Sequence, residues 1–521
     1  SETIDSLVLE ATARCNTLKF VEVDQSPDVN YLIPSRRQAP WENTTMQGPA
    51  GKPVDIALDG FNINTGLSQT YDLTIRTLTL EEVNLDPSGF NFTFSGNTTA
   101  ITLKNASVTW SGDPDWQWNA GEPLTFSAEG SYNRLIGMIG LVPPDTDLTV
   151  GNGTTLEFYQ SGSLASGVPD TSRLYFQNNA NQADIDGGTL DIHSSYLIWG
   201  SNDSKMSVRN GGKLIVRGTG SVLRSTGGDF TVDSGGVIEL GLGAVILDAS
   251  EGTVTLNDGS IDIADFGKLL TGAMNVNGSS IVTLGPGAFV DAGSFVNVAN
   301  GVTLTLDGTG NGATLLTERL VQEAGSLVRL TGQSVLAVSS GAGQTWDDGS
   351  IEIEPNATLV IRPGARVNLE NAIKVDGTVR VAGILIPTSL MAMTGNGTLQ
   401  TVGGGFIAIA DLAPVNIDPT IRMNLLSTLT MRIDPSAGKS AKLIANSAFI
   451  NEGAFLALNI TNDKVLPAGT QFTIIEYPDG NGAGSLFRRP GEPLNRLKDG
   501  DEIVAGQNTY RINYNPTSIT L

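Results

Sequence analysis

The sequence predicts an all-β protein whose main part is a right-handed parallel β-helix, with a less regular N-terminal region and a C-terminal β capping module. A phrase of glycine followed by alternating aliphatic residues recurs along the chain, and its copies at Gly188, Gly212 and Gly236 begin 24 residues apart. Each interval contains further short strands bounded by Gly or Asn-Gly turns. Strands joined by tight turns in this way stack as coils about 4.8 Å apart. Separate β-sandwich domains, the alternative, lack a fixed register of this length.

Composition narrows the classes of function. Of the 521 residues, 40% are hydrophobic and only 16% are charged, and the net charge is −23. This charge repels nucleic acid and anionic membranes, and no apolar run approaches the roughly 18 residues of a membrane span. We therefore expect neither a nucleic-acid partner nor membrane insertion. The single cysteine, Cys15, excludes an intrachain disulfide, and the single histidine, His193, removes most routes to zinc sites or histidine-based catalysis.

Residues 1–145 form the predicted N-terminal region. Ile4, Leu7, Val8 and Cys15 fall on one helical face, so we predict a short amphipathic helix that covers the open end of the coil. Cys15 is then a small buried hydrophobic residue, with an intermolecular disulfide or thiol chemistry as the alternative. The strands that follow, up to Trp110, recur about every 12 residues, which fits early coils or a small sandwich. The sequence leaves both readings open.

Residues 146–452 contain the regular coils. Because side chains alternate between the two faces of a strand, Leu190 and Ile192 are predicted to point inward and Asp191 outward. Aliphatic residues at the same place in successive coils then form an interior stack. Glycine, as at Gly212, is expected where the backbone turns with positive φ or packs closely at a corner.

The remaining residues form the predicted C-terminal module, 453–521, and show a different pattern. Strand-like phrases occupy Gly469–Ile475 and Asn508–Tyr514, a Leu-Lys-Asp-Gly sequence lies at Leu497–Gly500, and the chain ends on Ile519–Leu521. This segment resembles the closing module of autotransporter-associated β-strand repeat proteins, and the Gly-rich coils before it resemble them in style. The resemblance implies a passenger-type parallel β-helix. The family's membrane translocator barrel does not follow the last residue here, so we do not extend the resemblance to self-transport.

Parallel β-helices include enzymes that cleave polysaccharides, so we searched for a carbohydrate-active site. Polygalacturonase-like enzymes carry several short signatures, of which only a lone Asp347–Asp348 pair is present. Asp184, Asp186, Asp191 and His193 are close in sequence, and paired carboxylates can cleave glycosides. Solvated strand and turn residues explain them better, and His193 is expected to be an ordinary exposed histidine. We therefore predict no enzymatic activity.

Two further features are candidates for binding. The acidic turns Asp113–Asp115 and Asp307–Asn311 offer oxygen ligands for a structural calcium ion. Neither has the spacing of an EF-hand or of a nonapeptide calcium repeat, so we expect no cofactor and keep calcium as the alternative. Trp116 and Trp118 are two residues apart and would share one face of a strand. Such a pair suits a stacking platform for sugar rings or an anchor for a partner, although burial in the N-terminal cap explains it nearly as well.

We therefore predict a non-enzymatic extracellular structural protein, a β-helical rod that assembles head to tail into a filament or surface layer. The first residues lack the pattern of a signal peptide, so we expect a signal segment to have been removed. The alternatives are a cell-surface adhesin that binds a glycan or a host protein and, less favoured, a polysaccharide-degrading tailspike or lyase. The ends of a coil present unpaired backbone groups that can join copies of the chain. The predicted assembly interface consists of Ile4, Leu7, Val8, Tyr510, Ile512, Tyr514, Ile519 and Leu521.

Overall fold

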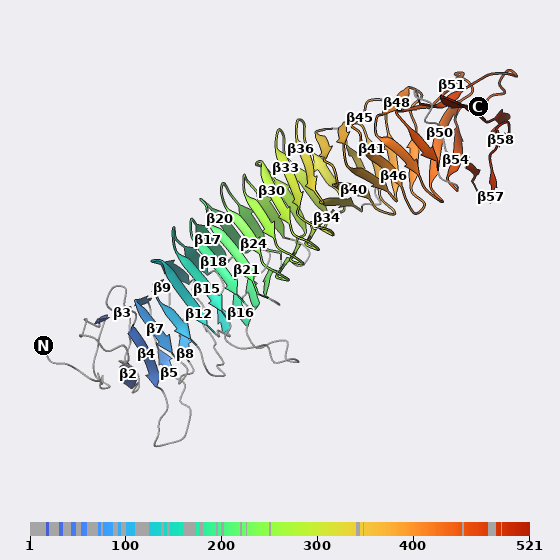
Figure 1. Cartoon of the computed structure of the whole chain (residues 1–521). Helices are drawn as coiled ribbons and strands as arrows, with labels where there is room; N and C mark the ends of the chain where they lie inside the picture. The colour runs from blue at the N-terminus through green and yellow to red at the C-terminus, as the bar shows by residue number, and fades with distance from the viewer. Residues whose placement is uncertain are drawn as a thin grey trace. The chain divides into compact units, whose positions relative to one another are not determined.

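A computed structural model shows strands and turns, and no helix, in the residues that it describes (Figure 1). The chain divides into two compact units, Ser1–Ala273 (unit 1) and Met274–Leu521 (unit 2). The described residues are 17–19, 31–34, 43–47, 54–59, 71–73, 77–86, 92–94, 100–109, 124–136, 140–142, 146–159, 173–176, 181–193, 196–199, 203–218, 221–225, 227–248, 252–339, 344–346, 348–450, 453–477, 486–490 and 492–521.

Unit 1 is a parallel β-helix with three sides, each a sheet of strands from successive coils. Side 1 contains β1 (Thr17–Lys19), β3 (Asn43–Gln47), β6 (Thr77–Glu81), β9 (Ala100–Lys104), β11 (Thr125–Glu129), β14 (Asp147–Val150), β17 (Gln182–Asp186), β20 (Lys205–Arg209), β23 (Asp229–Val232) and β26 (Thr253–Leu256). Side 2 contains β2 (Tyr31–Pro34), β4 (Val54–Asp59), β7 (Val83–Asp86), β10 (Ser107–Thr109), β12 (Tyr132–Ile136), β15 (Thr155–Tyr159), β18 (Thr189–His193), β21 (Lys213–Arg217), β24 (Val237–Leu240) and β27 (Ser260–Ile263). Side 3 contains the pair β5 (Tyr71–Leu73) and β8 (Phe92–Phe94), then β13 (Gly140–Val142), β16 (Arg173–Phe176), β19 (Tyr196–Trp199), β22 (Val222–Ser225), β25 (Val245–Asp248) and β28 (Lys268–Leu270).

The predicted parallel β-helix is confirmed, and its core is the predicted interior stack. On side 2, Leu156, Leu190, Leu214, Ile238 and Ile261 are in register on successive strands, and each is 0% exposed. Fully buried aliphatic residues of this size contribute roughly 1.5–3 kcal/mol each relative to exposure. The stack therefore accounts for the stability of the coils and leaves the outward positions free for polar residues.

Glycine shapes the corners in the two predicted ways. Gly211 has a φ of +79°, which L-amino acids with side chains rarely adopt. At the next residue, Gly212, an added Cβ would lie 2.3 Å from the carbonyl oxygen of Ile185 in the preceding coil. The Gly-Gly pair thus makes the turn and also permits the close contact between coils.

The early strands of unit 1 belong to coils and not to a sandwich. β6, β9, β11 and β14 pair in parallel, one after another, on side 1. Within the described residues this decides the question that strand spacing left open. The predicted N-terminal helix and Cys15 lie outside the described residues.

Unit 2 continues the same architecture, and β29 (Ala273–Val276) contains the boundary between the units. Side 1 contains β32 (Phe295–Val298), β35 (Leu320–Gln322), β38 (Gln344–Trp346), β41 (Arg366–Leu369), β44 (Ile384–Pro387), β47 (Phe406–Ile409), β50 (Thr428–Asp434) and β54 (Phe455–Ile460). Side 2 contains β30 (Ser280–Leu284), β33 (Thr303–Gly308), β36 (Leu327–Gly332), β39 (Ser350–Ile353), β42 (Ala372–Val375), β45 (Ala392–Thr394), β48 (Pro414–Ile417), β52 (Lys442–Ala445) and β55 (Thr473–Glu476). Side 3 contains β31 (Phe289–Asp291), β34 (Thr314–Thr317), β37 (Val335–Val338), β40 (Thr358–Ile361), β43 (Thr378–Val381), β46 (Thr398–Thr401), β49 (Thr420–Met423) and β53 (Ala448–Ile450).

Strand direction changes at the C-terminal end of unit 2. β61 (Ser518–Thr520) lies antiparallel to β55, and β60 (Asn513–Asn515) lies antiparallel to β61. Antiparallel pairs also join β56 (Arg488–Arg489) to β57 (Glu492–Arg496) and β58 (Glu502–Ala505) to β59 (Asn508–Arg511). A further short strand, β51 (Lys439–Ser440), pairs antiparallel with β50. The C-terminal strand β61 therefore covers the edge of β55, the last parallel strand of side 2, as expected of a capping module.

Candidate functional site

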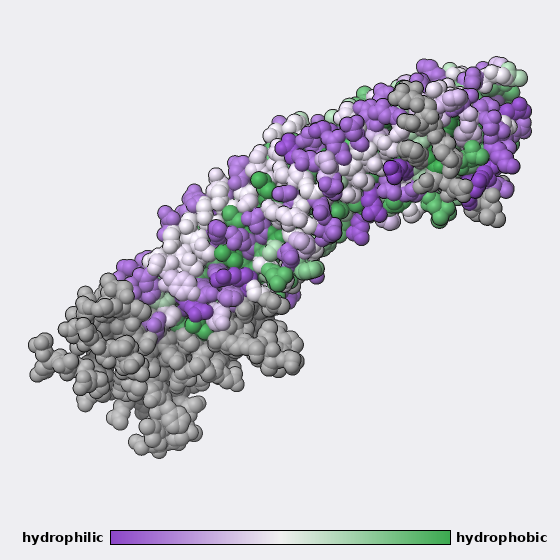
Figure 2. Space-filling model, in the orientation of Figure 1, coloured by the Kyte–Doolittle hydropathy of each residue, from purple (hydrophilic) through white to green (hydrophobic). Residues whose placement is uncertain are grey.

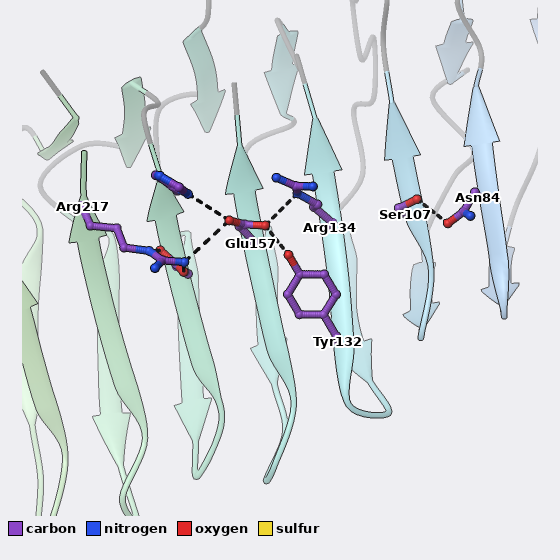
Figure 3. A network of polar contacts seen from close by, with 8 residues as sticks. Asn84, Ser107, Tyr132, Arg134, Glu157 and Arg217 are labelled. Atoms are coloured by element: carbon purple, nitrogen blue, oxygen red, sulfur yellow. Dashed lines mark hydrogen bonds and ion pairs between the residues drawn. The ribbon is translucent and has the colours of Figure 1, made fainter. Parts of the chain in front are cut away.

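The main polar cluster is on the outer face of side 2 in unit 1 (Figure 3). Four neighbouring strands, β12, β15, β18 and β21, pair in parallel and place their outward residues in columns. Residues from three of these columns form the cluster, which we call the Glu157 cluster. It consists of Tyr132, Arg134, Glu157, Tyr159, Asp191, His193 and Arg217.

Glu157 is the centre of the cluster and is only 4% exposed, although it points outward. The hydroxyl of Tyr132 donates a hydrogen bond to its Oε2. Nε of Arg134 lies 2.7 Å from the same oxygen, as an ion pair without hydrogen-bond alignment. Nδ1 of His193 lies 3.1 Å from Oε1, and an Nη2 of Arg217 lies 3.7 Å from Oε1. Both carboxylate oxygens therefore face donors from neighbouring coils.

Asp191, in register with Glu157 on the next strand, is also only 4% exposed. Arg217 binds it with two nitrogens: Nε donates to Oδ1 at 2.9 Å, and Nη2 donates to Oδ2. A guanidinium and a carboxylate fit this two-point geometry well. Asp191 points outward but is buried because neighbouring side chains, such as that of Arg217, cover it from outside.

Aromatic rings complete the cluster. The guanidinium carbon of Arg134 lies 4.2 Å from the ring centroid of Tyr159, a cation–π contact. The ring of His193 meets Tyr159 edge to face, with centroids 5.1 Å apart. Tyr132 contributes an exposed ring to the cluster. Its hydroxyl is hydrogen-bonded to Glu157, but the residue is 47% exposed. Its ring is the exposed apolar surface of the cluster.

The electrostatics of the two carboxyls differ. Burial alone would raise the pKa of Glu157, but the hydrogen bonds of Tyr132 and His193 and the charge of Arg134 outweigh it, so the pKa is lowered. Burial raises the pKa of Asp191, and the hydrogen bonds and charge of Arg217 offset only part of that effect. Burial and the hydrogen bond to Glu157 raise the pKa of Tyr132 to about 12.

A pair of carboxyls with opposite shifts is a pattern seen in acid–base catalysis. A general acid, however, needs a proton on an oxygen that can reach the substrate. Both oxygens of Asp191 accept hydrogen bonds from Arg217, and both oxygens of Glu157 face Tyr132, Arg134 or His193. The geometry supports a closed polar brace between coils more than a proton-transfer site.

The four polar residues that are close in sequence do not form one cluster, so the carbohydrate-site hypothesis, which the sequence did not favour, is wrong for this set. Asp184 and Asp186 are on side 1, where Nη2 of Arg209 lies 2.6 Å from Oδ2 of Asp184 and 3.2 Å from Oδ2 of Asp186. Asp191 and His193 are on side 2 in the Glu157 cluster. The expectation of an ordinary exposed histidine is also wrong, because the His193 side chain is 32% exposed and contacts Glu157.

Sequence reasoning missed Glu157, the residue that organises the cluster. A signal was present, because Leu156-Glu157-Phe158 has the same alternation as Leu190-Asp191-Ile192. Aligning the two phrases would have put both carboxylates in one column. The connection between these strands is longer than the 24-residue period, which obscured the alignment.

The predicted C-terminal interface residues are placed by the structure within unit 2. Tyr510 and Leu521 are each 5% exposed, and Ile512 and Ile519 are each 0% exposed. The hydroxyl of Tyr514 accepts a hydrogen bond from the backbone N–H of Phe487 at 3.2 Å, and burial raises its pKa. Tyr510, Ile512, Ile519 and Leu521 thus pack inside the capping module, whereas Tyr514 is half-buried.

The other predicted binding residues lie outside the described residues. These are Trp116, Trp118, Ile4, Leu7, Val8 and the turn Asp113–Asp115. Of the second acidic turn, Asp307 accepts a hydrogen bond from Thr331 at 2.8 Å. In the part of the chain that the structure describes, no group of three or more His, Cys, Asp or Glu residues is arranged to hold a metal ion.

No protein-family model matches the chain, and no curated protein is similar to it. Among the described residues, no helix is long and apolar enough to span a membrane.

Proposed function

We propose that this protein is an extracellular structural component, a β-helical scaffold without catalytic activity that assembles end to end with copies of itself. The β-solenoid fold itself fits a structural or adhesin-like protein. The resemblance of residues 453–521 to autotransporter-associated β-strand repeat proteins supports the extracellular location. The observation that carries the proposal is that the outward charged side chains connect consecutive coils.

This bracing occurs in both units. In unit 1, Arg217 binds Asp191 and Arg209 binds Asp184, each across neighbouring coils. In unit 2, Glu352 accepts from Arg329 at 2.9 Å and from Lys374 at 3.3 Å, which links three successive strands of side 2. A single exposed ion pair contributes only about 0–1 kcal/mol, but networks along the stack oppose separation of the coils.

The exposed surface fits a scaffold whose contacts with other copies lie at its ends. On the face in Figure 2, hydrophilic residues predominate and hydrophobic residues form only scattered patches. At the C-terminal module, Val504 on β58 is 77% exposed and Val465 is 63% exposed. We place the assembly contact of this end on Val504 and its strand, because four of the five residues predicted at this end, Tyr510, Ile512, Ile519 and Leu521, are buried.

Electron microscopy across a dilution series tests the assembly. We expect filaments or sheets from the wild-type chain, and their loss on Val504→Asp. Leu242→Asp is the matched control, because Leu242 is 58% exposed at a turn of unit 1 and is no part of the proposed contact. Single particles at every concentration would refute self-assembly, whereas equal loss in both variants would refute the location.

One observation favours a second candidate, an adhesin that binds a neutral glycan. The exposed ring of Tyr132 is held in place through its hydroxyl by Glu157, whose carboxylate also contacts Arg134 and His193, and an exposed aromatic ring beside polar groups suits a sugar. A glycan array compares the wild type with Tyr132→Ala and, at the predicted site, with Trp116→Ala/Trp118→Ala. Binding that survives Tyr132→Phe and is lost in Tyr132→Ala would support this candidate. Release of sugar from a polysaccharide panel would instead contradict the non-enzymatic proposal.

A further inference from the structure

Two consecutive coils of unit 2 are not paired with each other on one of their three sides. The side 1 sheet that contains β32 ends at β35, and the next side 1 sheet begins at β38. On the other two sides the same coils are paired in parallel, β36 with β39 and β37 with β40. We call the break between β35 and β38 the seam. Among the described residues, no ladder of backbone hydrogen bonds joins these two strands.

Side-chain amides take the place of the ladder at the seam. Oε1 of Gln344 accepts a hydrogen bond from the backbone N–H of Leu320 and another from the indole of Trp346, both at 3.1 Å. Nε2 of Gln322 donates to the carbonyl oxygen of Ser350 at 2.9 Å. Of these contacts, the bond from Leu320 to Gln344 joins β35 to β38, and the bond from Gln322 to Ser350 joins β35 to β39 on side 2. A single flexible side chain holds two strands less rigidly than a ladder of backbone bonds.

The interior columns change character at the same point. On side 1, the register partner of Gln322 before the seam is Val298, and the register partner of Gln344 after it is Val367, both 0% exposed. At the seam itself, Leu320 and Trp346 keep one inward position of each strand apolar, and the other is an amide, Gln322 or Gln344, each only 8% exposed. Burial of amides in an aliphatic core is unfavourable unless every polar atom has a partner.

Three polar atoms at the seam have no such partner among the described residues. They are Oε1 of Gln322, Nε2 of Gln344 and Oγ of Ser326, whose residue is 1% exposed. Gln322 and Ser326 are neighbours, because a Cβ added at Gly349 would lie 2.9 Å from Nε2 of Gln322 and 2.5 Å from Oγ of Ser326. Buried polar atoms without a protein partner are commonly hydrogen-bonded by buried water.

We propose that the seam is a water-binding site in the core of unit 2 and the point at which its coils open. Water hydrogen-bonds to Gln322, Gln344 and Ser326, and side 1 opens there while sides 2 and 3 stay paired. The coils before β35 and after β38 can then tilt against each other about the two sides that remain closed. This inference is independent of the proposed function.

Hydrogen exchange of the full chain, read by mass spectrometry, tests the proposal. We expect the amides of β35 and β38 to exchange at least about tenfold faster than those of β36, β37, β39 and β40, which lie in the same coils. Gln344→Leu removes the acceptor for Leu320 and should raise exchange of β35 further. Gln333→Leu, at an exposed turn, is the matched control and should leave exchange unchanged.

A reversible cross-link provides the opposite test. Val321 and Thr345 are the outward central residues of β35 and β38. In a Cys15→Ala background, a disulfide between Val321→Cys and Thr345→Cys should slow exchange at the seam, and a reductant should restore it. Equal protection of all three sides in the wild type, or exchange unaffected by the closed disulfide, would overturn the proposal.

Discussion

At the scale of single residues, Glu157 shows how a solenoid stabilises an outward charge. Its carboxylate is buried by the side chains that it binds, so its environment is built by the neighbouring coils and not by its own strand. Removing one partner from such a buried set leaves uncompensated charges, which costs more than the set contributes when intact. The energetic importance of Glu157 is therefore greater than that of an exposed glutamate on the same side.

We expect Glu157→Gln to destabilise unit 1 by about 3 kcal/mol, because Arg134 and Arg217 lose the charge that faces them. Glu239→Gln is the control, since Glu239 is on the same side and its side chain is 34% exposed beside Lys213. Its effect should be below about 1 kcal/mol. Urea unfolding of both variants measures the difference. Equal effects would show that Glu157 is an ordinary surface residue.

The pH dependence of stability follows from the opposite shifts of the two carboxyls. The pKa of Glu157 is lowered from 4.5, so its ionised form stabilises the fold above that value, and this stability is lost as the pH falls through the lowered pKa. Glu157→Gln should therefore lose less stability than the wild type in acid. Asp191 has a pKa raised from 3.8, so its contribution is present at low pH and is lost as the pH rises through the raised pKa. Thermal unfolding between pH 3 and 7 should show opposite changes in slope for Glu157→Gln and Asp191→Asn.

At the scale of elements, the corners determine how closely coils stack. Gly212→Ala should destabilise unit 1 by about 1–3 kcal/mol, because the new Cβ would lie 2.3 Å from a backbone oxygen that cannot move alone. Gly151→Ala is the matched control, since its Cβ would have its nearest contact at 3.9 Å. Chemical unfolding of the pair distinguishes close contact from a general effect of removing glycine. A neutral Gly212→Ala would mean that the coils can separate locally at little cost.

Strands of side 1 that have similar sequence patterns are joined to their neighbours by different kinds of hydrogen bond. β32 and β35 pair by backbone bonds, whereas β35 and β38 are joined by the side chain of Gln344. Uniform strand periodicity in the sequence therefore does not imply uniform rigidity. Positions where amides replace aliphatic residues in an interior column are the sequence sign of such a seam.

At the scale of the whole molecule, each unit must manage the edges of its sheets. The C-terminal strand β61 covers β55 in antiparallel orientation, and Ile519 of that strand is 0% exposed. Uncovered parallel edges recruit other chains without specificity. The capping module therefore limits contacts at this end to the residues that remain exposed, such as Val504.

Ile519→Asp should open the capped edge, because a charge at a buried apolar position displaces β61. We expect irregular, concentration-dependent aggregation measured by light scattering, and a free energy of unfolding of unit 2 that is lower by more than about 3 kcal/mol. Thr517→Asp, at an exposed position two residues away, is the control and should remain like the wild type. If Ile519→Asp stayed soluble and stable, β61 would not be the cap.

The sequence by itself determined the architecture. The recurrence of glycine and the alternation of Leu190, Asp191 and Ile192 predicted parallel coils with an aliphatic interior, because both signals are local and repeat in every coil. Only the tertiary structure decided which outward residues meet. Glu157 lies beside Asp191, and Asp184 lies on another side, because lateral neighbours in a solenoid depend on the length of each connection. The absence of a ladder at the seam was likewise decided there, since a strand's own residues do not reveal whether its neighbour is within hydrogen-bonding reach.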